Sequence, residues 1–289
     1  MYSTVAGGRN NIASGTLIPG MEGSFVGGGQ SNGATGQGSV VCGGNSNIAG
    51  GFFSSIGGGF TNKVLGNGGV ISGGTENTVW MANGTIAGGG LNNTYSISST
   101  IGGGLSNGAT GLNSTISGGF NNKTGSTGAF VGGGATNIAS AFYSTVAGGI
   151  SNTAGSTDAF IGGGASNTIV ANYGTIAGGQ SNVTWDINAS VGGGGSNGAT
   201  GTYSVISGGD RNNTNGNYST ISGGQLNTLW SQYATIGGGA NNGVTGQYSV
   251  VGGGSGNRAN TNYGTIAGGQ SSITWDANAF IGGGASNGA

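Results

Sequence analysis

Few side chains in this 289-residue chain could take part in catalysis. It has six Asp and Glu, five Lys and Arg, one cysteine (Cys42) and no histidine. Ser-His-Asp and Cys-His sites need an imidazole base, and protein zinc sites are built mainly from Cys and His. The acidic residues are scattered singly, which gives no support to catalysis by paired carboxylates. We therefore expect no enzyme activity, no cofactor and no metal site.

Binding through aromatic side chains is the chemistry that remains. Tryptophans stand at Trp80, Trp185, Trp230 and Trp275, and the last three are 45 residues apart. Regularly spaced indoles can stack on sugars or anchor a protein partner. Packing against a neighbouring chain explains them equally well at this point. Five tyrosines at steps of 15 residues, 203 to 263, predict a structural ladder of aromatic rings.

The element that positions these residues is a 15-residue repeat. We call the Val or Ile before each glycine pair the anchor. The anchors are Val5, Val26, Val41, Ile56, Ile71, Ile86, Ile101, Ile116, Val131, Val146, Ile161, Ile176, Val191, Ile206, Ile221, Ile236, Val251, Ile266 and Ile281. Val5 stands 21 residues before Val26, so six extra residues lie between Gly15 and Gly23. We expect residues 1–289 to form a single repeat array. Because both ends lie inside a repeat and no signal peptide precedes the first one, we expect a segment of a longer fibre.

Each repeat predicts one coil of an all-β solenoid, or β-roll. Two runs with period-two alternation predict two short parallel strands of about five residues. About 19 coils, each adding roughly 4.8 Å, predict a rod of about 90 Å. The glycine pair after the anchor predicts a tight corner, and the second corner looks looser.

Four positions in each coil are expected to point inward. They are the anchor, the small residue two before it, the Asn six after it, and the Ala, Val or Thr eight after it. All 11 charged residues fall elsewhere, as the cost of burying an unpaired charge requires. We favour an internal Asn ladder over a row of Asn in surface turns, because stacked amides can satisfy one another and the corner backbone.

The pattern Asn-x-Ala-x-Gly-x-x-Ser-x-Ile-x-Gly-Gly, found for example at residues 107–119, resembles the head repeats of trimeric autotransporter adhesins. That family repeats Ala-x-Ala-x-Gly-x-x-Ser-Val-Ala-Ile-Gly, a unit one residue shorter. The resemblance implies a left-handed parallel β-roll, three packed chains, and binding to a host matrix or surface. Similar arrays occur in phage tail-fibre-like proteins and other surface fibres. The spacing is also similar to that of the ryegrass antifreeze β-roll, Asn-x-Val-x-Gly-x-x-Asn-x-Val-x-x-Gly.

The outer face of the first strand predicts an oligomer interface. Its positions directly before the anchors carry Thr, Phe, Val or Ser, those directly after carry Gly, Ala, Ser or Cys42, and neither set holds a charge. An ordinary solvated β face would carry Lys and Glu, so we favour a protein contact face, most simply in a parallel homotrimer. The candidate interface residues are Phe25, Thr115, Phe130, Thr145, Phe160, Thr175 and Phe280.

The leading interpretation is a non-catalytic, adhesive segment of an extracellular, cell-surface or virion-surface fibre. Its Trp residues would bind a surface glycan or protein. The alternatives are an ice-binding solenoid that uses the Thr-rich face, although Phe and Val interrupt it, and a self-assembling filament subunit. The net charge of −1 gives no electrostatic case for nucleic acid, and no apolar run is long enough to insert into a membrane.

Overall fold

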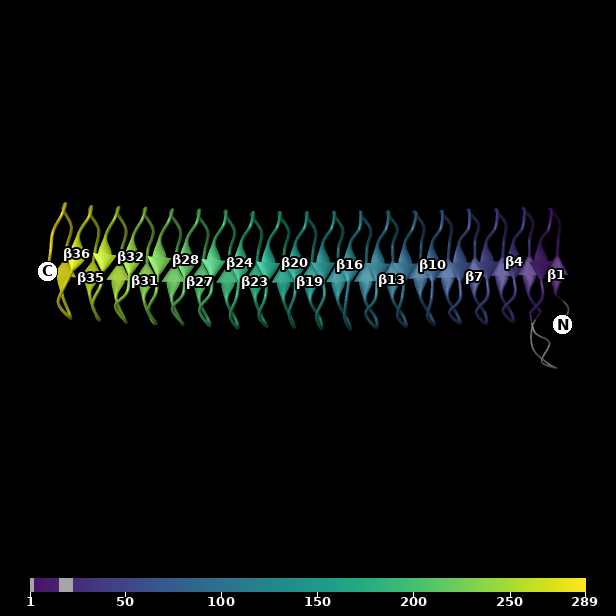
Figure 1. Cartoon of the computed structure of the whole chain (residues 1–289), viewed down its shortest axis with the longest axis horizontal. Helices are drawn as coiled ribbons and strands as arrows, with labels where there is room; N and C mark the ends of the chain where they lie inside the picture. The colour runs from purple at the N-terminus through teal and green to yellow at the C-terminus, as the bar shows by residue number, and fades with distance from the viewer. Residues whose placement is uncertain (1–2, 16–22) are drawn as a thin grey trace. The chain divides into compact units, whose positions relative to one another are not determined.

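The computed structural model describes residues 3–15 and 23–289, and contains β-strands and turns without helix in that part of the chain. The six-residue insertion before Gly23 lies outside the described residues. The described chain forms two compact units, Met1–Tyr143 and Ser144–Ala289. Within each unit the chain winds as a parallel β-solenoid, one 15-residue coil after another (Figure 1). The predicted fold class is therefore confirmed.

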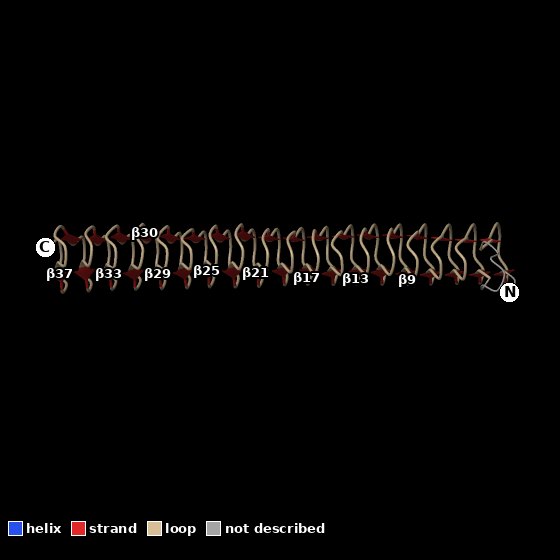
Figure 2. Cartoon of the chain, turned by 90° about the horizontal axis from the view of Figure 1, so that it is seen from below, coloured by secondary structure: helices blue, strands red, loops and turns tan. Residues whose placement is uncertain are grey.

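Each coil contributes one strand to each of two sheets, except the last coil, which contributes to the first sheet only, and the two sheets form opposite rows in Figure 2. In unit 1 the first sheet contains β1 (Thr4–Val5), β3 (Phe25–Val26), β5 (Val40–Val41), β7 (Ser55–Ile56), β9 (Val70–Ile71), β11 (Thr85–Ile86), β13 (Thr100–Ile101), β15 (Thr115–Ile116) and β17 (Phe130–Val131). The second sheet of unit 1 contains β2 (Ile12–Ala13), β4 (Gly33–Ala34), β6 (Ile48–Ala49), β8 (Lys63–Val64), β10 (Thr78–Val79), β12 (Asn93–Thr94), β14 (Gly108–Ala109), β16 (Lys123–Thr124) and β18 (Ile138–Ala139).

Unit 2 repeats this arrangement. Its first sheet contains β19 (Thr145–Val146), β21 (Phe160–Ile161), β23 (Thr175–Ile176), β25 (Ser190–Val191), β27 (Val205–Ile206), β29 (Thr220–Ile221), β31 (Thr235–Ile236), β33 (Val250–Val251), β35 (Thr265–Ile266) and β37 (Phe280–Ile281). Its second sheet contains β20 (Thr153–Ala154), β22 (Thr168–Ile169), β24 (Val183–Thr184), β26 (Gly198–Ala199), β28 (Asn213–Thr214), β30 (Thr228–Leu229), β32 (Gly243–Val244), β34 (Arg258–Ala259) and β36 (Ile273–Thr274).

The strands are two residues long, so the expected length of about five residues is wrong. The reason is that the two corners take up most of the 15 residues of each coil. Strands pair in parallel and in register with the same strand of the next coil, as Thr100 does with Thr115. A third contact forms four residues after each anchor, where single residues such as Gln225 and Ala240 bridge. A coil therefore touches its neighbour at two strands and one corner.

The corner after the first strand needs the second glycine of each pair. At Gly209 φ is +93°, and a Cβ there would collide with the carbonyl oxygen of Gly224 in the next coil. The first glycine is different, because a Cβ on Gly208 would meet open space. The sequence analysis treated the two glycines alike, and the structure separates them.

The opposite corner is as regular as the first, so the expectation of a looser turn is wrong. The residue three before the anchor has a left-handed backbone in coil after coil, with φ of +55° at Tyr203 and +58° at Asn188. Gly, Asn and Asp tolerate this conformation best, and they hold many of these positions. That enrichment was a sequence signal for a tight corner.

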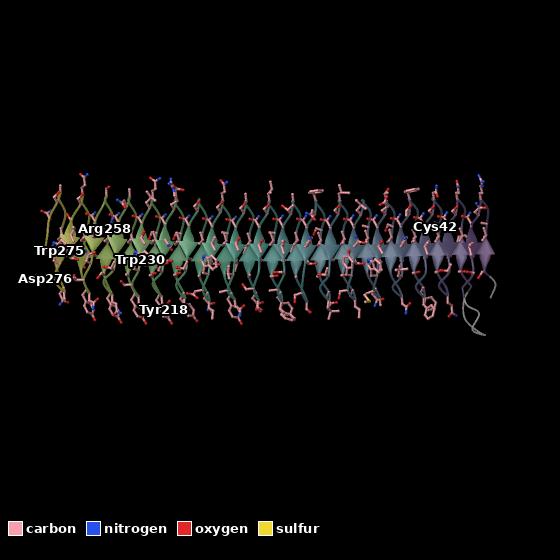
Figure 3. The ribbon with its side chains drawn as sticks, in the orientation of Figure 1. Cys42, Tyr218, Trp230, Arg258, Trp275 and Asp276 are labelled. Carbon is pink, nitrogen blue, oxygen red and sulfur yellow. The ribbon has the colours of Figure 1, made fainter. Side chains whose placement is uncertain are left out.

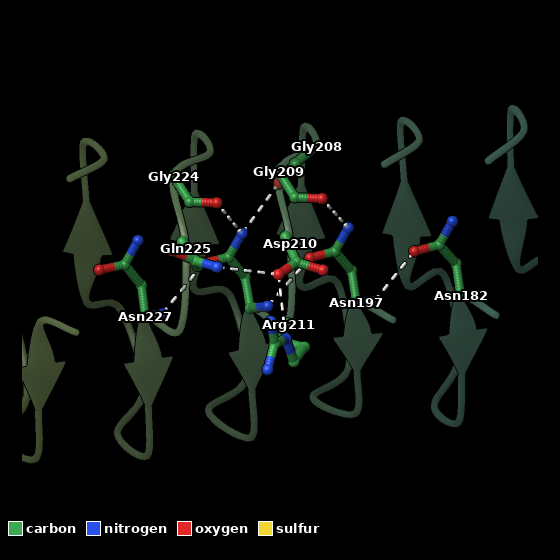
Figure 4. Close-up of polar contacts among 10 residues, drawn as sticks. Asn182, Asn197, Gly208, Gly209, Asp210, Arg211, Gly224, Gln225 and Asn227 are labelled. Atoms are coloured by element: carbon green, nitrogen blue, oxygen red, sulfur yellow. Dashed lines mark hydrogen bonds and ion pairs between the residues drawn. The ribbon is translucent and has the colours of Figure 1, made fainter. Parts of the chain in front are cut away.

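The interior is thin and fully packed. Anchors from Val26 to Ile266 are 0% exposed, whereas Val5, with a described neighbouring coil on one side only, is 45% exposed. None of the described charged residues is buried. The Asn row forms the predicted ladder. Asn212 donates from Nδ2 to the carbonyls of Gly208 and Gly224, and its Oδ1 accepts the Asn227 N–H at 3.0 Å (Figure 4).

Two inward positions lie opposite each other across the coil, the residue two before the anchor and the residue ten further along. The first of them is Gly in the pairs Gly69 with Val79, Gly84 with Thr94, Gly174 with Thr184 and Gly264 with Thr274. A Cβ on Gly264 would lie 2.7 Å from Thr274 Oγ1. Other coils hold larger buried pairs, such as Ala159 with Ile169 and Ser219 with Leu229, so the space at this position differs between coils.

Candidate binding faces

The first face is the outer side of the first sheet, formed by the residues directly before and after the anchors. All seven predicted interface residues lie on it and are half-buried or exposed. They are Phe25 on β3, Thr115 on β15 and Phe130 on β17 in unit 1, and Thr145 on β19, Phe160 on β21, Thr175 on β23 and Phe280 on β37 in unit 2.

Strand register brings some of these residues together and leaves others apart. Phe160 lies between Thr145 and Thr175, and Thr115 pairs with Phe130. Phe25 pairs instead with Val40, and Phe280 with Thr265. The candidates therefore form two local groups and two separate aromatic positions.

The rings of Phe25 and Phe280 also lean over their own strands. A Cβ on Gly27 would lie 3.4 Å from Cε1 of Phe25, and one on Gly282 would lie 3.5 Å from Cε1 of Phe280. The pairing of a large residue with a small one thus has an explanation within a single chain. Phe280 is nevertheless 67% exposed and Phe160 43%, so both rings keep free apolar surface.

Charge is distributed unequally between the two outer faces. The first face carries none, whereas the second face, the outer side of the second sheet, carries the exposed Lys63, Lys123 and Arg258. Removing a charged face from water is costly, so the first face is the one that another chain could cover at the lower electrostatic cost.

The four tryptophans lie directly after strands of the second sheet, with exposures from 47% at Trp80 to 63% at Trp275. Trp80 stacks on Tyr95 of the next coil, with ring centroids 6.2 Å apart. In unit 2, Trp185, Trp230 and Trp275 stand three coils apart, which is about 14 Å. Trp230 and Trp275 are labelled in Figure 3.

The Trp275 indole lies close to a glycine of the next coil. A Cβ added to Gly288, in the next coil, would lie 3.3 Å from Nε1 of Trp275. Gly198 and Gly243 occupy the equivalent positions after Trp185 and Trp230, although no Trp185 atom lies within 4 Å of a Cβ on Gly198 and the nearest atoms to one on Gly243 belong to Arg258. This spacing between a Trp and a Gly was visible in the sequence. It could not be interpreted without knowing that the two positions lie next to each other in successive coils. Arg258 reaches the same area, because a Cβ on Gly243 would lie 2.5 Å from its Nη1.

Tyr203, Tyr218, Tyr233, Tyr248 and Tyr263 form the predicted aromatic ladder, which we call the Tyr ladder. Successive centroids are 5.0 to 5.2 Å apart and successive ring planes differ by 3° to 10°. The five tyrosines are 45% to 55% exposed. Figure 3 labels Tyr218 on the corner that carries the ladder.

Asp210 takes part in a hydrogen-bond network that the sequence did not predict. Asp210 Oδ2 accepts hydrogen bonds from Gln225 Nε2 at 3.1 Å and Arg211 Nε at 2.9 Å (Figure 4). These bonds, that from Gln225 first, hold the pKa of Asp210 below its ordinary value because they favour the charged carboxylate. The network connects two successive coils on the solvent side.

In residues 3–15 and 23–289, no three His, Cys, Asp or Glu side chains come together as metal ligands would. Over the same ranges, no helix has the length and apolarity needed to span a bilayer. No protein-family model matches the chain, and a search of curated proteins finds no relative. The resemblance to adhesin heads and to the antifreeze roll therefore rests on the residues of the repeat alone.

Proposed function

We propose that the chain is a non-catalytic, adhesive β-solenoid of a cell-surface or virion-surface fibre. It assembles as a parallel homotrimer through the first face and binds a surface glycan or protein through the Trp residues of the second face. The observation that carries the proposal is the row of exposed indoles at three-coil intervals in unit 2. Because each coil brings its side chains back to the same face, a repeated contact residue becomes a linear array of equal sites.

The geometry around Trp275 supports the binding role. One side of the indole lies against Gly288, where a side chain would be in contact with it, and the residue remains 63% exposed. A ring held in this way is a pre-oriented platform for a sugar ring or an apolar partner side chain, so little side-chain entropy is lost on binding. The steps of about 14 Å suit a chain-like ligand that several indoles contact together.

Glycan-array binding tests this proposal with a triple variant, Trp185→Thr, Trp230→Thr and Trp275→Thr. Thr is native at this position of other coils, for example Thr200 and Thr245, so the solenoid should be kept. We expect the triple variant to lose at least about tenfold in affinity for the bound glycan. Leu65→Thr, at the same position of a unit 1 coil, is the matched control and should bind as wild type. Equal binding by the triple variant and wild type would remove the Trp residues from the proposed site.

Ice binding is the second candidate, and one specific observation favours it. Thr85, Thr100 and Thr115 follow one another in strict register along the first sheet. A regular row of short hydroxyl and methyl groups is the kind of surface that can order water. Thermal hysteresis of the purified protein, compared with a Thr100→Lys variant, distinguishes this activity from adhesion. A wild-type solution without hysteresis would exclude it.

A further inference from the structure

The Tyr ladder has surface that the proposed adhesive and trimer contacts do not use. Its centroid spacing of 5.0 to 5.2 Å exceeds the separation of about 3.5–4.0 Å between aromatic planes in contact. Nearly parallel rings at this spacing are not in full face-to-face contact, and each tyrosine stays 45% to 55% exposed. The row therefore presents a strip of exposed aromatic surface, about 20 Å long from first to last ring.

The ladder also has defined ends. Asn188 and Asn278 take the position of the tyrosine in the coils before Tyr203 and after Tyr263. The same two corners carry Asp186 and Asp276, both exposed. An acidic side chain thus brackets the aromatic strip at each end.

The charges at this corner are of one sign. We define the corner turn of a coil as the three residues from ten to twelve after its anchor. The corner turns of unit 2 contain Asp158, Asp186 and Asp276 and no Lys or Arg. The cations of unit 2, Arg211 and Arg258, belong to the other corner and to the second sheet. The carboxylates at this corner therefore attract a cation, and no Lys or Arg of the same turns repels it.

We propose that the Tyr ladder is a binding site for an elongated, flat, cationic aromatic molecule that lies lengthwise along the corner of unit 2. Its flat body adds edge-to-face and offset contacts with several tyrosines at once. Its positive charge is favoured by the exposed parts of the ring faces and by Asp186 and Asp276. Four consecutive rings are needed, because a ligand of about 15 Å spans three coil steps.

Thioflavin T, a flat monocationic dye of this length, is the probe. It is titrated by fluorescence into protein of a single mass isolated by gel filtration. The expected result is one saturable site per chain with an affinity that falls as salt rises, since exposed charges are screened. Tyr233→Asn splits the ladder into two pairs of rings and should weaken the affinity at least about tenfold. Asn is compatible with the left-handed backbone at this position, because the native residues Asn188 and Asn278 adopt that backbone at the same position of other coils.

Matched variants separate the ladder from its surroundings. Tyr173→Asn removes an exposed tyrosine at the same position of a coil outside the ladder and should leave the affinity within about twofold. Tyr233→Phe retains the ring and should bind as wild type. The double variant Asp186→Asn with Asp276→Asn should bind more weakly and with a smaller salt dependence. The double variant Tyr218→Asn with Tyr248→Asn leaves three isolated rings and should lose affinity in the same way, which serves if Tyr233→Asn does not fold.

Two results would overturn the proposal. One is wild-type affinity in folded Tyr233→Asn or, if that variant does not fold, in the double variant Tyr218→Asn with Tyr248→Asn. The other is an unchanged affinity and salt dependence in the double Asp variant, which would remove the preference for a cation. Loss of glycan binding in the Trp variants bears on the adhesive function only, so the two proposals can fail separately.

Discussion

At the scale of single residues, the repeat assigns different physical tasks to neighbouring positions of the same type. The two glycines of each pair look equivalent in the sequence. Gly209 needs its positive φ and its missing Cβ, whereas Gly208 has open space around it. This pair thus combines one essential glycine with one tolerant position, whereas in other pairs, such as that of Gly238 with Gly239, both residues have a positive φ.

Alanine substitution should separate these two glycines. Gly209→Ala places a Cβ against the Gly224 carbonyl and forces a left-handed backbone on Ala, so we expect a loss of about 2–4 kcal/mol in unfolding free energy. Gly208→Ala should cost about 1 kcal/mol or less. Chemical denaturation of both variants measures the difference. Equal losses would mean that the corner does not have the described backbone.

Asp210 gives a pH-dependent prediction. Its folded pKa is lowered, so its contribution to stability is present above the ordinary Asp value and is lost as pH falls through the lowered value. Gln225→Ala removes the leading cause and should move the Asp210 pKa back toward the ordinary value. An NMR pH titration of the carboxyl carbon follows this shift. Gln270→Ala, at the same position of a distant coil, should leave the titration unchanged.

At the scale of the strand, side-chain direction alternates over two residues and decides what a position tolerates. Ile176 is 0% exposed, whereas Thr175, its neighbour on β23, faces solvent. We expect Ile176→Asp to unfold the protein at ambient temperature or lower its melting temperature severely, because the charge has no partner in the thin interior. Thr175→Asp should have a mild effect. Thermal melts compare them, and similar melts would contradict the inward assignment.

The close approach of Gly264 to Thr274 across the interior predicts a rescue. Gly264→Ala should destabilise by about 1–3 kcal/mol, because the added methyl approaches Thr274 Oγ1. Thr274→Ala added to that variant should recover most of the loss and give a pairing of small residues like that of Ser249 with Ala259 in the preceding coil. A double-mutant cycle with additive energies would show that the two positions do not share space.

Much of the coil could be predicted because its rules are periodic. The fixed step defined the inward positions, the Asn ladder and the glycine corner, since each follows from side-chain direction and the cost of unpaired polar groups. Strand length and the left-handed residue at the second corner depend on backbone angles that close the coil. Tyrosine has no local preference for that conformation, so Tyr203 gave no warning, although Asn188 and Gly128 at the same position did. The candidate binding faces could be located from the sequence, but their partners could not be identified. A row of exposed residues at the same position of successive coils does not define which molecule binds to it.

At the scale of the whole molecule, the absence of charge from the first face concerns assembly. Burial of its Phe, Val and Thr side chains would stabilise an oligomer by roughly 25 cal/mol for each Å² of apolar surface removed from water. Phe160→Lys would bring three ammonium groups together in a parallel trimer. We expect it to dissociate the trimer or lower its melting temperature sharply.

Sedimentation equilibrium of the wild type and Phe160→Lys measures this effect. Thr153→Lys, on the second sheet of the same unit, is the control and should keep the wild-type mass. A monomeric wild type whose mass and melting temperature are the same as those of Phe160→Lys would exclude the trimer.

The parallel pairing also determines the electrical character of each unit. The amide of Val40 donates to Ser54 of the following coil, whereas the register of Phe25 with Val40 points the amide of the next residue, Val41, toward Phe25 of the preceding coil. Peptide dipoles that alternate along a strand largely cancel, unlike those of an α-helix, which add along its axis. A protein with a net charge of −1 should thus also have a small permanent dipole moment and orient only weakly in an external field, which transient electric birefringence would measure.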